Sequence, residues 1–304
     1  MELRDTRPGA IIGLTARGSR HDRAAETRGA LDGAPCEWIL TAGSAVAVAE
    51  RGDGVLALAR AADDPRPSAG PSVLLGRTGG GAAMVRSAEL DPEADAAPAG
   101  TVLRDLREIL AALDREDAQL ALAAVGMAAW HRATRFCPRC GSPLRHESDG
   151  WVLRCDADGS QHFPRTDTAV IMAVRDPDDR LLLAQNVRAR GRFHSVLAGF
   201  VEPGETFEDA VARETREEVG IDVERVEYAG SQPWPFPASL MVGFRAWSAH
   251  RGELLLQDDE IAEARWCTRA ELASALTSEE MRLPGPGSIG RALIEDWYGE
   301  RLPE

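Results

Sequence analysis

The sequence predicts a mixed α/β (α+β) fold built from three parts. Residues 1 to about 100 are rich in glycine, alanine and proline and contain short runs typical of β-strands. Two cysteines two residues apart then predict a small metal-binding ribbon, and the remainder alternates strand-like runs with helices. We therefore expect an α+β N-terminal domain over 1–132, a small zinc ribbon over 133–165 and a larger α/β domain over 166–304.

The N-terminal part shows no arrangement of residues typical of catalysis. Its strand-like runs are separated by turn-rich stretches such as 63–70, and helical periodicity follows them. The expected strands are 44–49, 55–58, 72–75 and 82–85, and the expected helices are 101–113 and 116–132.

The cysteines of the central part predict a structural zinc site. Cys137-Pro-Arg-Cys140-Gly has the spacing of a zinc knuckle, and Cys155 follows at the distance expected of a second knuckle. The position three residues after Cys155 is Asp158 instead of a cysteine. The fourth ligand is then Asp158 through oxygen or His162 through a ring nitrogen, unless the ribbon has lost its ion and is held by packing alone.

The C-terminal part begins with a predicted buried hairpin and continues through one unusual helix. The hairpin joins 169–174 to 180–184 around Asp176-Pro-Asp-Asp. After the unusual helix, which starts at Phe207, we expect strands at 225–229 and 240–249 and helices at 269–275 and 287–298.

This helix carries acids where a core-facing stripe is expected. At roughly 100° per residue, Glu214, Glu217 and Glu218 fall on the same half as the apolar residues. Buried carboxylates must be paired or bound to metal, and Mg²⁺ prefers oxygen ligands that it shares with substrate phosphates. The pattern predicts a divalent-cation site, and the alternative is an ordinary acidic surface helix.

The segment 199–221 resembles the Nudix box, G-x5-E-x7-R-E-U-x-E-E-x-G-U. The matching residues are Gly199, Glu205, Arg213, Glu214, Glu217, Glu218, Gly220 and Ile221. Thr215 stands where the family usually has an aliphatic residue of similar size. The resemblance implies a Nudix α/β/α sandwich at the C-terminus that hydrolyses a nucleoside diphosphate linked to another group.

The same resemblance implies two or more catalytic Mg²⁺ or Mn²⁺ ions and their ligands. Glu214 and Glu218 are the implied direct ligands, with Glu260 and the carbonyl of Ala198 completing the set. Glu217 and Glu218 are the implied catalytic acids, and which carboxylate takes the proton is left open. Arg213 is expected to anchor the loop before the helix by ion pairing.

Ten residues beyond the box, a stiff loop displays two aromatic side chains. Three prolines alternate with Trp234 and Phe236, which suits stacking on a heterocycle and disfavours a regular ladder. The alternative is a surface turn with its aromatics packed inward. The loop is similar to the S-Q-P-W-P-F-P-x-S signature of the NADH pyrophosphatase (NAD⁺ diphosphatase) branch of the Nudix family. The implied substrate-binding residues are Phe163, Gln232, Pro233, Trp234, Pro235, Phe236, Pro237, Ala238, Ser239 and Gly290.

Membership of that branch implies hydrolysis of NAD(H) to AMP and nicotinamide mononucleotide, and removal of NAD caps from RNA 5′ ends. It also implies a homodimer and a zinc ribbon that normally has four cysteines. Two alternatives stay open: a Nudix hydrolase acting on another diphosphate such as ADP-ribose, and a non-enzymatic zinc-ribbon adaptor that binds nucleotides.

Composition limits where such a protein can act. The 35 basic residues, all arginine, against 49 acidic residues leave a net charge of −14, which argues against broad electrostatic capture of nucleic acid. The N-terminus lacks the basic start and apolar run of a signal peptide, and the most apolar stretch, 120–130, is too short to span a bilayer. We expect a cytoplasmic protein without membrane association.

Overall fold

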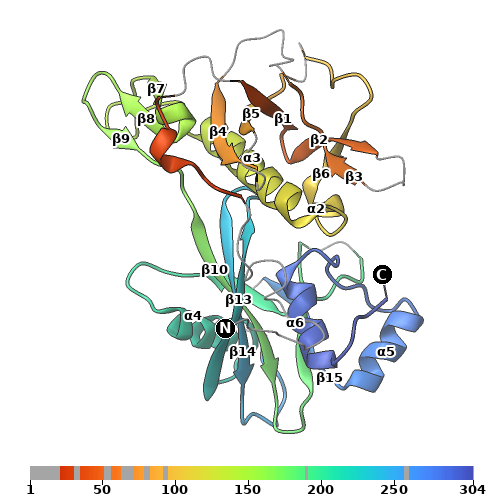
Figure 1. The fold of residues 1–304 in the computed structure, drawn as a ribbon. Coiled ribbons are helices and arrows are strands. Elements are labelled where there is room, and N and C mark those ends of the chain that lie inside the picture. Colours follow the sequence, from red (N-terminus) through yellow and green to blue (C-terminus); the bar gives the residue numbers. More distant parts are fainter. Residues whose placement is uncertain are drawn as a thin grey trace, which may run out of the picture. The chain divides into compact units, whose positions relative to one another are not determined.

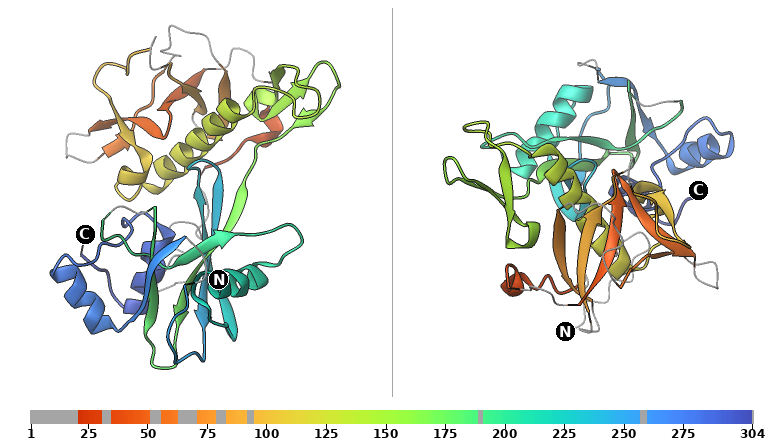
Figure 2. Two further views of the ribbon diagram at one scale, coloured as in Figure 1. Left: turned by 180° about the vertical axis from the view of Figure 1, so that it is seen from behind. Right: turned by 90° about the horizontal axis from the view of Figure 1, so that it is seen from above.

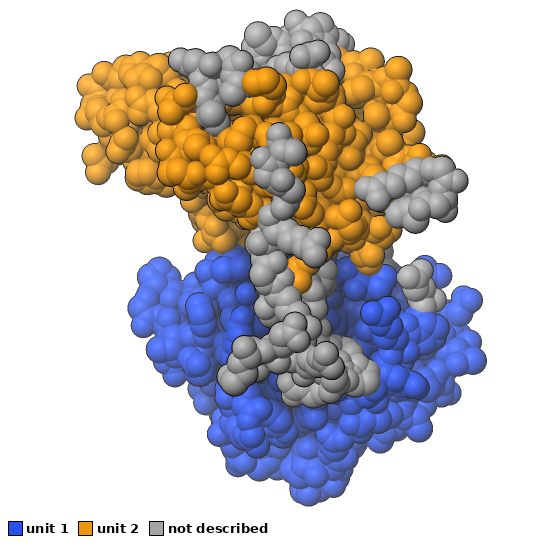
Figure 3. All heavy atoms as spheres, viewed as in Figure 1, with its two compact units in different colours: residues 1–17, 167–233, 240–304 blue, residues 18–166, 234–239 orange. Residues whose placement is uncertain are grey.

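The computed structural model describes residues 21–30, 35–50, 56–62, 71–78, 83–91, 95–188, 191–256 and 260–303. These residues form two compact units, drawn in two colours in Figure 3. Unit 1 holds the described residues of 167–233 and 240–303, and unit 2 holds those of 21–166 together with 234–239. The division into three domains made from the sequence stays a prediction.

Unit 2 is built on a six-stranded sheet with the order β3-β2-β1-β5-β4, in which β6 also pairs with β2. β1 and β5 are parallel, whereas the other paired strands are antiparallel. The strands are β1 (Cys36–Ala42), β2 (Ala45–Glu50), β3 (Leu56–Leu58), β4 (Ser72–Arg77), β5 (Met84–Glu89) and β6 (Val102–Asp105). A short 3₁₀ turn, η1 (Ala25–Thr27), precedes them.

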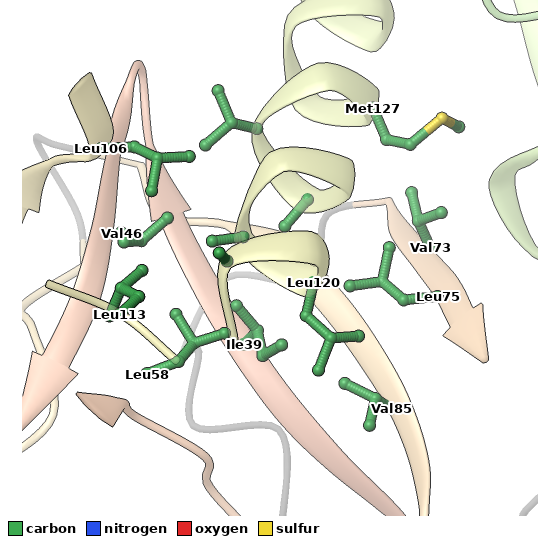
Figure 4. Close-up of a cluster of buried hydrophobic side chains, with 14 of the residues drawn as sticks. Ile39, Val46, Leu58, Val73, Leu75, Val85, Leu106, Leu113, Leu120 and Met127 are labelled. Carbon is green, nitrogen blue, oxygen red and sulfur yellow. The ribbon is translucent and has the colours of Figure 1, made fainter. Parts of the chain in front are cut away.

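One face of this sheet is covered by the long helix α3 (Arg115–Ala133), which follows the single-turn helix α2 (Leu106–Ile109) (Figures 1 and 2). Figure 4 shows Leu120 of α3 near Leu75 and Val85 of the sheet, and Met127, further along the same helix, on the side of Val73. Fully burying an aliphatic side chain of this size contributes about 1.5–3 kcal/mol. This layer is therefore the core of unit 2.

Two expectations for the N-terminal part need correction. The helix expected over 101–113 is wrong at its start, because Val102–Asp105 is strand β6 and pairs with β2. Local periodicity did not reveal this long-range pairing. Strand β1 was not expected at all, although it lies at the centre of the sheet. The stretch 63–70 and residues 55 and 82 lie outside the described residues.

The central segment is a small three-stranded antiparallel sheet in the order β7-β8-β9. Its strands are β7 (Leu144–Glu147), β8 (Val152–Cys155) and β9 (Gln161–His162), with the 3₁₀ turn η2 (Ser148–Gly150) between the first two. The ring N–H of Trp151 donates a 2.7 Å hydrogen bond to the carbonyl of Leu74, which ties this segment to β4 within unit 2.

Unit 1 is an α/β/α sandwich around a second six-stranded sheet, of order β13-β14-β10-β11-β15 with β12 pairing with β10. Along β10, Val170 and Met172 pack in one buried cluster with α4, whereas Ile171 and Ala173 pack in another with α5 and α6. Successive strand residues face opposite sides of a sheet, so the helices cover both faces (Figure 1). The layered fold expected from the resemblance is confirmed.

The elements of unit 1 match most of the expected ones. The expected hairpin is β10 with β11, joined antiparallel. Strand β13 extends to Trp234, so part of the segment expected to be irregular is strand, and β12 and β15 were not expected. The bounds are β10 (Asp167–Arg175), β11 (Leu181–Asn186), β12 (Leu197–Phe200), α4 (Phe207–Val219), β13 (Arg225–Trp234), β14 (Ser239–Trp247), β15 (Ile261–Cys267), α5 (Arg269–Thr277) and α6 (Ile289–Tyr298).

Among the described residues, no helix has both the length and the apolar character needed to cross a bilayer.

Candidate metal and substrate sites

Helix α4 begins and ends at residues that favour helix termini. The hydroxyl of Thr206 accepts from the backbone N–H of Asp209, which caps the N-terminus. Gly220 ends the helix in the left-handed conformation, with φ 72°, and its N–H donates to the carbonyl of Arg216. The box glycine at 220 is thus required by the backbone.

The acids of α4 differ in burial. Glu218 is 5% exposed and lies among the buried residues Val211, Thr215 and Val219. The side chain of Glu214 is 14% exposed, whereas that of Glu217 is 55% exposed. The expected burial of acids on the core side is confirmed for Glu214 and Glu218, and Glu217 lies at the solvent edge.

Arg213 connects these acids to the loop that precedes the helix. Its guanidinium donates to both carboxylate oxygens of Glu205, at 2.8 and 3.0 Å, and to the carbonyl of Phe200 at 2.8 Å. It also donates to Glu214 and Glu217, each at 2.9 Å. Bidentate arginine–carboxylate pairs fix geometry as well as charge. Arg213 therefore anchors the loop, as the sequence predicts.

Glu214 lies directly against β12. A Cβ added to Gly199 would come within 1.8 Å of the carboxyl carbon of Glu214, so any other residue at 199 would displace this carboxylate. The neighbouring Ala198 pairs with Ile171 on β10 and is exposed. The carbonyl expected to bind metal thus belongs to the residue just before Gly199, against which the Glu214 carboxylate packs.

The charge balance of this layer favours a cation. Burial raises the pKa of Glu214 despite its hydrogen bond from Arg213. The bond from Arg213 lowers the pKa of Glu205, and that carboxylate in turn raises the pKa of Arg213. Arg213 is shared by three carboxylates, and Glu218 adds a fourth acid nearby on the helix. Clustered carboxylate oxygens with a backbone carbonyl are the donor set that Mg²⁺ or Mn²⁺ requires, so these residues fit the implied ions.

Glu260 lies just before β15 and is exposed, and its backbone carbonyl accepts from the N–H of Val187. Residues 257–259, beside it, lie outside the described residues. Its role as a metal ligand stays a prediction.

The ribbon contains two knuckles with the same backbone geometry. In the first, Cys137 N–H donates to the Ser142 carbonyl at 2.8 Å, and Gly141 N–H donates to the Cys137 carbonyl at 2.9 Å. In the second knuckle, Cys155 N–H donates to the Ser160 carbonyl and Gly159 N–H donates to the Cys155 carbonyl, both at 2.9 Å. The two glycines have φ 74° and 72°. Asp158 therefore occupies the place in the second knuckle that Cys140 occupies in the first.

Four side chains meet between the knuckles. One ligand atom from each of Cys137, Cys140, Cys155 and Asp158 lies within 4.8 Å of the others. Ser160 N–H and Oγ donate to Asp158 Oδ1 at 2.9 and 2.6 Å, which orients the carboxylate. The ring nitrogen Nε2 of His162 lies 3.0 Å from Ser160 Oγ. Three sulfurs and one oxygen at this spacing fit a tetrahedral zinc ion.

The aromatic loop is attached to unit 2. Trp234 and Phe236 are half-buried and pack against the core of that unit, with their ring centroids 5.0 Å apart. The guanidinium of Arg107 lies 5.3 Å from the Phe236 ring centroid, and Pro235 is buried against Gly126 of α3. The rings are thus packed inward, as in the alternative interpretation, and their stacking on substrate stays a prediction.

The other expected substrate residues lie in different settings. Phe163, in unit 2, is 62% exposed. In unit 1, the amide of buried Gln232 donates to the Gly287 carbonyl and accepts from the Ile289 N–H, both at 2.7 Å. Gln232 therefore holds the start of α6. Pro233 and Pro237 are exposed, Ala238 and Ser239 are half-buried, and Gly290 is buried in the first turn of α6. That these residues form one site stays a prediction.

Phe200 was not among the site residues expected from the sequence. Its ring is 59% exposed, although it directly follows Gly199 and its carbonyl is held by Arg213. A large aromatic inside the box, next to the expected carbonyl ligand, was the signal available.

Comparison with known proteins agrees with this arrangement. Three family models match in chain order: an NADH pyrophosphatase-like rudimentary NUDIX domain over 36–130, an NADH pyrophosphatase zinc ribbon domain over 132–163 and a NUDIX domain over 164–284. The NAD-capped RNA hydrolase NudC of Mycobacterium bovis (strain BCG / Pasteur 1173P2) is 44% identical over 247 residues, 78% of this chain and 77% of that protein. NudC of Salmonella typhimurium is 41% identical over 194 residues, 63% of this chain and 72% of that protein.

Among solved structures, a NUDIX hydrolase from Nitrosomonas europaea is 22% identical, with a TM-score of 0.44, over 55% of this chain and 95% of that one. The order of the three family models and the share of the chain that the NudC relatives cover indicate the same family. The chain belongs to the Nudix hydrolase family, in its NADH pyrophosphatase branch with a zinc ribbon.

Proposed function

We propose that this protein hydrolyses the diphosphate of NAD(H) to AMP and nicotinamide mononucleotide, and removes NAD caps from RNA 5′ ends by the same cleavage. The observation that carries the proposal is the carboxylate layer formed by α4 against β12, with a single arginine shared among its acids. The names of the NudC relatives, which act on NAD-capped RNA, support the choice of substrate.

In this proposal, Glu214, Glu218, Glu260 and the carbonyl of Ala198 hold Mg²⁺ or Mn²⁺. Such ions neutralise phosphate oxygens and lower the pKa of a bound water. Arg213 keeps the acids and the preceding loop in place, since it bonds both. We assign to Glu217 the orientation of the attacking water or the acceptance of its proton, a role that the exposure of its carboxylate supports.

On the substrate side, we propose contacts from Phe163, the 232–239 loop and Gly290. The exposed ring of Phe163 supports a stacking role for it. Gln232 acts indirectly, because both ends of its amide already hold α6. By the resemblance to its branch, we also propose a homodimer, for which sedimentation should give twice the chain mass of 32.7 kDa.

The decisive assay incubates the purified protein with NADH and Mg²⁺ or Mn²⁺ and separates the products. AMP and reduced mononucleotide, lost on chelation and restored by metal, are expected. Cleavage of ADP-ribose but not NADH would instead indicate a different Nudix specificity, and no turnover of any diphosphate would indicate a binding protein. A short RNA with a 5′ NAD cap, compared with its triphosphate form, tests the decapping activity.

We further propose that a structural zinc ion is bound by Cys137, Cys140, Cys155 and Asp158. The matching geometry of the two knuckles supports Asp158 as the fourth ligand, because it stands in the place of a cysteine.

Elemental analysis of the wild type should give one zinc per chain. Asp158→Ala should lose most of it, and Asp158→Cys should retain it. Asp156→Ala is the matched control, because Asp156 lies in the same knuckle and bonds the exposed Arg145. Full zinc content in Asp158→Ala would show that this carboxylate is not a ligand.

A further inference from the structure

Gly290 leaves a neighbouring serine hydroxyl uncovered. A Cβ at this position would lie 3.2 Å from Ser195 Oγ, 3.4 Å from Ile171 Cδ1 and 3.6 Å from Pro284 Cγ. Any larger residue at 290 would therefore place carbon against the hydroxyl. Gly290 is among the residues implied to bind substrate, but no role has been assigned to the side chain of Ser195 beside it.

The backbone of Ser195 is held firmly. It exchanges two hydrogen bonds with Ala184 of β11, at 2.8 and 2.9 Å, and its neighbours His194 and Val196 are buried. Ser195 itself is half-buried. Within the part of the chain that the structure describes, no hydrogen bond is made by its hydroxyl. A half-buried hydroxyl of this kind suits ligand binding, because it is available for a hydrogen bond. Its backbone is also already ordered by the fold, so little conformational entropy is lost on binding.

Ser195 also lies close to the proposed metal layer. It precedes Ala198 by three residues in the same segment, which limits their separation to about 10 Å. Ile171, which contacts the Gly290 position, pairs with Ala198 across β10 and β12. Ser195 is therefore within the reach of a nucleotide whose diphosphate meets the metal layer.

We propose that the Ser195 hydroxyl binds substrate by hydrogen bonding the exocyclic nitrogen group of a heteroaromatic ring, and that Gly290 keeps the approach to it open. This inference rests on the proposed function and deepens it. Two rings of NADH carry such a group: the carboxamide of nicotinamide and the amine of adenine. The hydroxyl oxygen can accept from the N–H of either group.

The test compares Ser195→Ala with Ser274→Ala, a matched control on the exposed face of α5. For NADH, Ser195→Ala should lower kcat/KM by about three- to tenfold, the effect of losing one neutral hydrogen bond, and should weaken NADH binding to the metal-free protein similarly. Ser274→Ala should change neither quantity.

Two analogues identify the ring. Reduced nicotinamide hypoxanthine dinucleotide lacks the adenine amine, and reduced acetylpyridine adenine dinucleotide lacks the carboxamide nitrogen. The difference between wild type and Ser195→Ala should disappear with one of them. An equal loss with all three substrates would show a structural role and overturn the proposal, as would no loss with any.

Gly290→Ala gives an independent test, since alanine is favourable within a helix and the fold should be kept. Its methyl group should reduce kcat/KM about as much as Ser195→Ala does. The kcat/KM of the double variant should be no lower than that of the more impaired single variant. Additive losses would contradict shared action. Wild-type protein that binds NADH without cleaving it would refute the proposed function, while the binding comparison would still decide the role of Ser195.

Discussion

The main helices of the two units pack in the same way but differ in the partners of their acidic side chains. Each lies on one face of a six-stranded sheet, α3 in unit 2 and α4 in unit 1. Each also buries one acid among apolar residues, Asp117 on α3 and Glu218 on α4. The two acids have different surroundings.

Asp117 is neutralised within its own unit. Arg60 donates to one of its oxygens at 2.6 Å, and the N–H of Leu58 donates to the other at 2.9 Å. On α4, by contrast, Arg213 serves Glu205, Glu214 and Glu217 together. Arg60 is shared as well, through longer contacts to Glu37 at 3.3 Å and Glu116 at 3.5 Å, but Asp117 receives its shortest bond and a backbone N–H, which pair this buried acid within the fold. The three acids bonded by Arg213 lie at similar distances of 2.8–3.0 Å from it, and with Glu218 on the same helix they leave negative charge available to a divalent cation.

Replacing the buried acid of α4 should produce the largest effect. Glu218→Gln keeps the shape of the side chain and removes its charge, so we expect a fall in kcat of at least about a hundredfold. The free energy of unfolding in chelator should not fall, because a buried charge is removed. Activity with NADH and urea unfolding measure the two effects.

The matched control is Glu208→Gln, in the exposed first turn of the same helix. It should keep full activity. Comparable losses in the two variants would mean that the net charge of the helix, and not a ligand at 218, supports activity.

The corresponding change in unit 2 should affect stability instead. Asp117→Asn leaves Arg60 without its shortest ion pair and should lower the free energy of unfolding by about 2–4 kcal/mol. Activity per folded molecule should be unchanged. Glu116→Gln, which removes a longer 3.5 Å contact to the same arginine, should cost less than about 1 kcal/mol. A loss of activity in Asp117→Asn at low temperature, where the protein stays folded, would contradict this division.

The same contrast explains what the sequence predicted well. Glu214, Glu218, the end of α4 at Gly220 and the knuckle at Cys137 depend on short-range spacing and are found where expected, whereas Glu217, expected on the same half of the helix, has a side chain that is 55% exposed. The burial of Glu214 and Glu218 also followed from helical periodicity. Local patterns were sufficient because neighbours in sequence make these features.

Elements that depend on distant partners were missed. Strand β1 gains its place from parallel pairing with β5, and β6 from pairing with β2, so neither is visible in a short window. Trp234 and Phe236 have the composition of a stacking loop, yet their burial depends on the core of unit 2, far away in sequence. The position of Ser195 beside Gly290 likewise arises only on folding.

A third prediction concerns the loss of stability at acidic pH, which a buried histidine of unit 2 should cause. His131 of α3 donates to the Gly150 carbonyl at 2.8 Å, and its ring lies 4.6 Å from that of His146. Burial lowers the pKa of His131 to about 4, with His146 adding to the effect, against an ordinary value of 6.5. The folded state therefore binds fewer protons than the unfolded state between these values, and stability falls as the pH drops from 6.5 towards 4.

We expect this loss to reach about 1–3 kcal/mol for His131. His131→Gln keeps a donor for Gly150 and should flatten the fall in urea midpoint between pH 6.5 and 4. His250→Gln, at a half-buried histidine near the protein surface in unit 1, should follow the wild type. Parallel pH curves for all three proteins would exclude His131 as a source of acid sensitivity.

The smallest expected effects come from the N-terminal caps of the two helices. Asp114 caps α3 and Thr206 caps α4, each by accepting from the backbone N–H three residues later. Asp114→Ala and Thr206→Ala should each cost about 1 kcal/mol in urea unfolding. Thr206 precedes Glu214 by eight residues, about 12 Å along the helix axis. Mn²⁺ affinity, measured by calorimetry, should therefore change less than about twofold in both variants, because packing on β12 and the bonds of Arg213 hold the acids. A marked fall in Mn²⁺ affinity confined to Thr206→Ala would show that the cap is part of the metal site, and that α4 differs from α3 along its whole length.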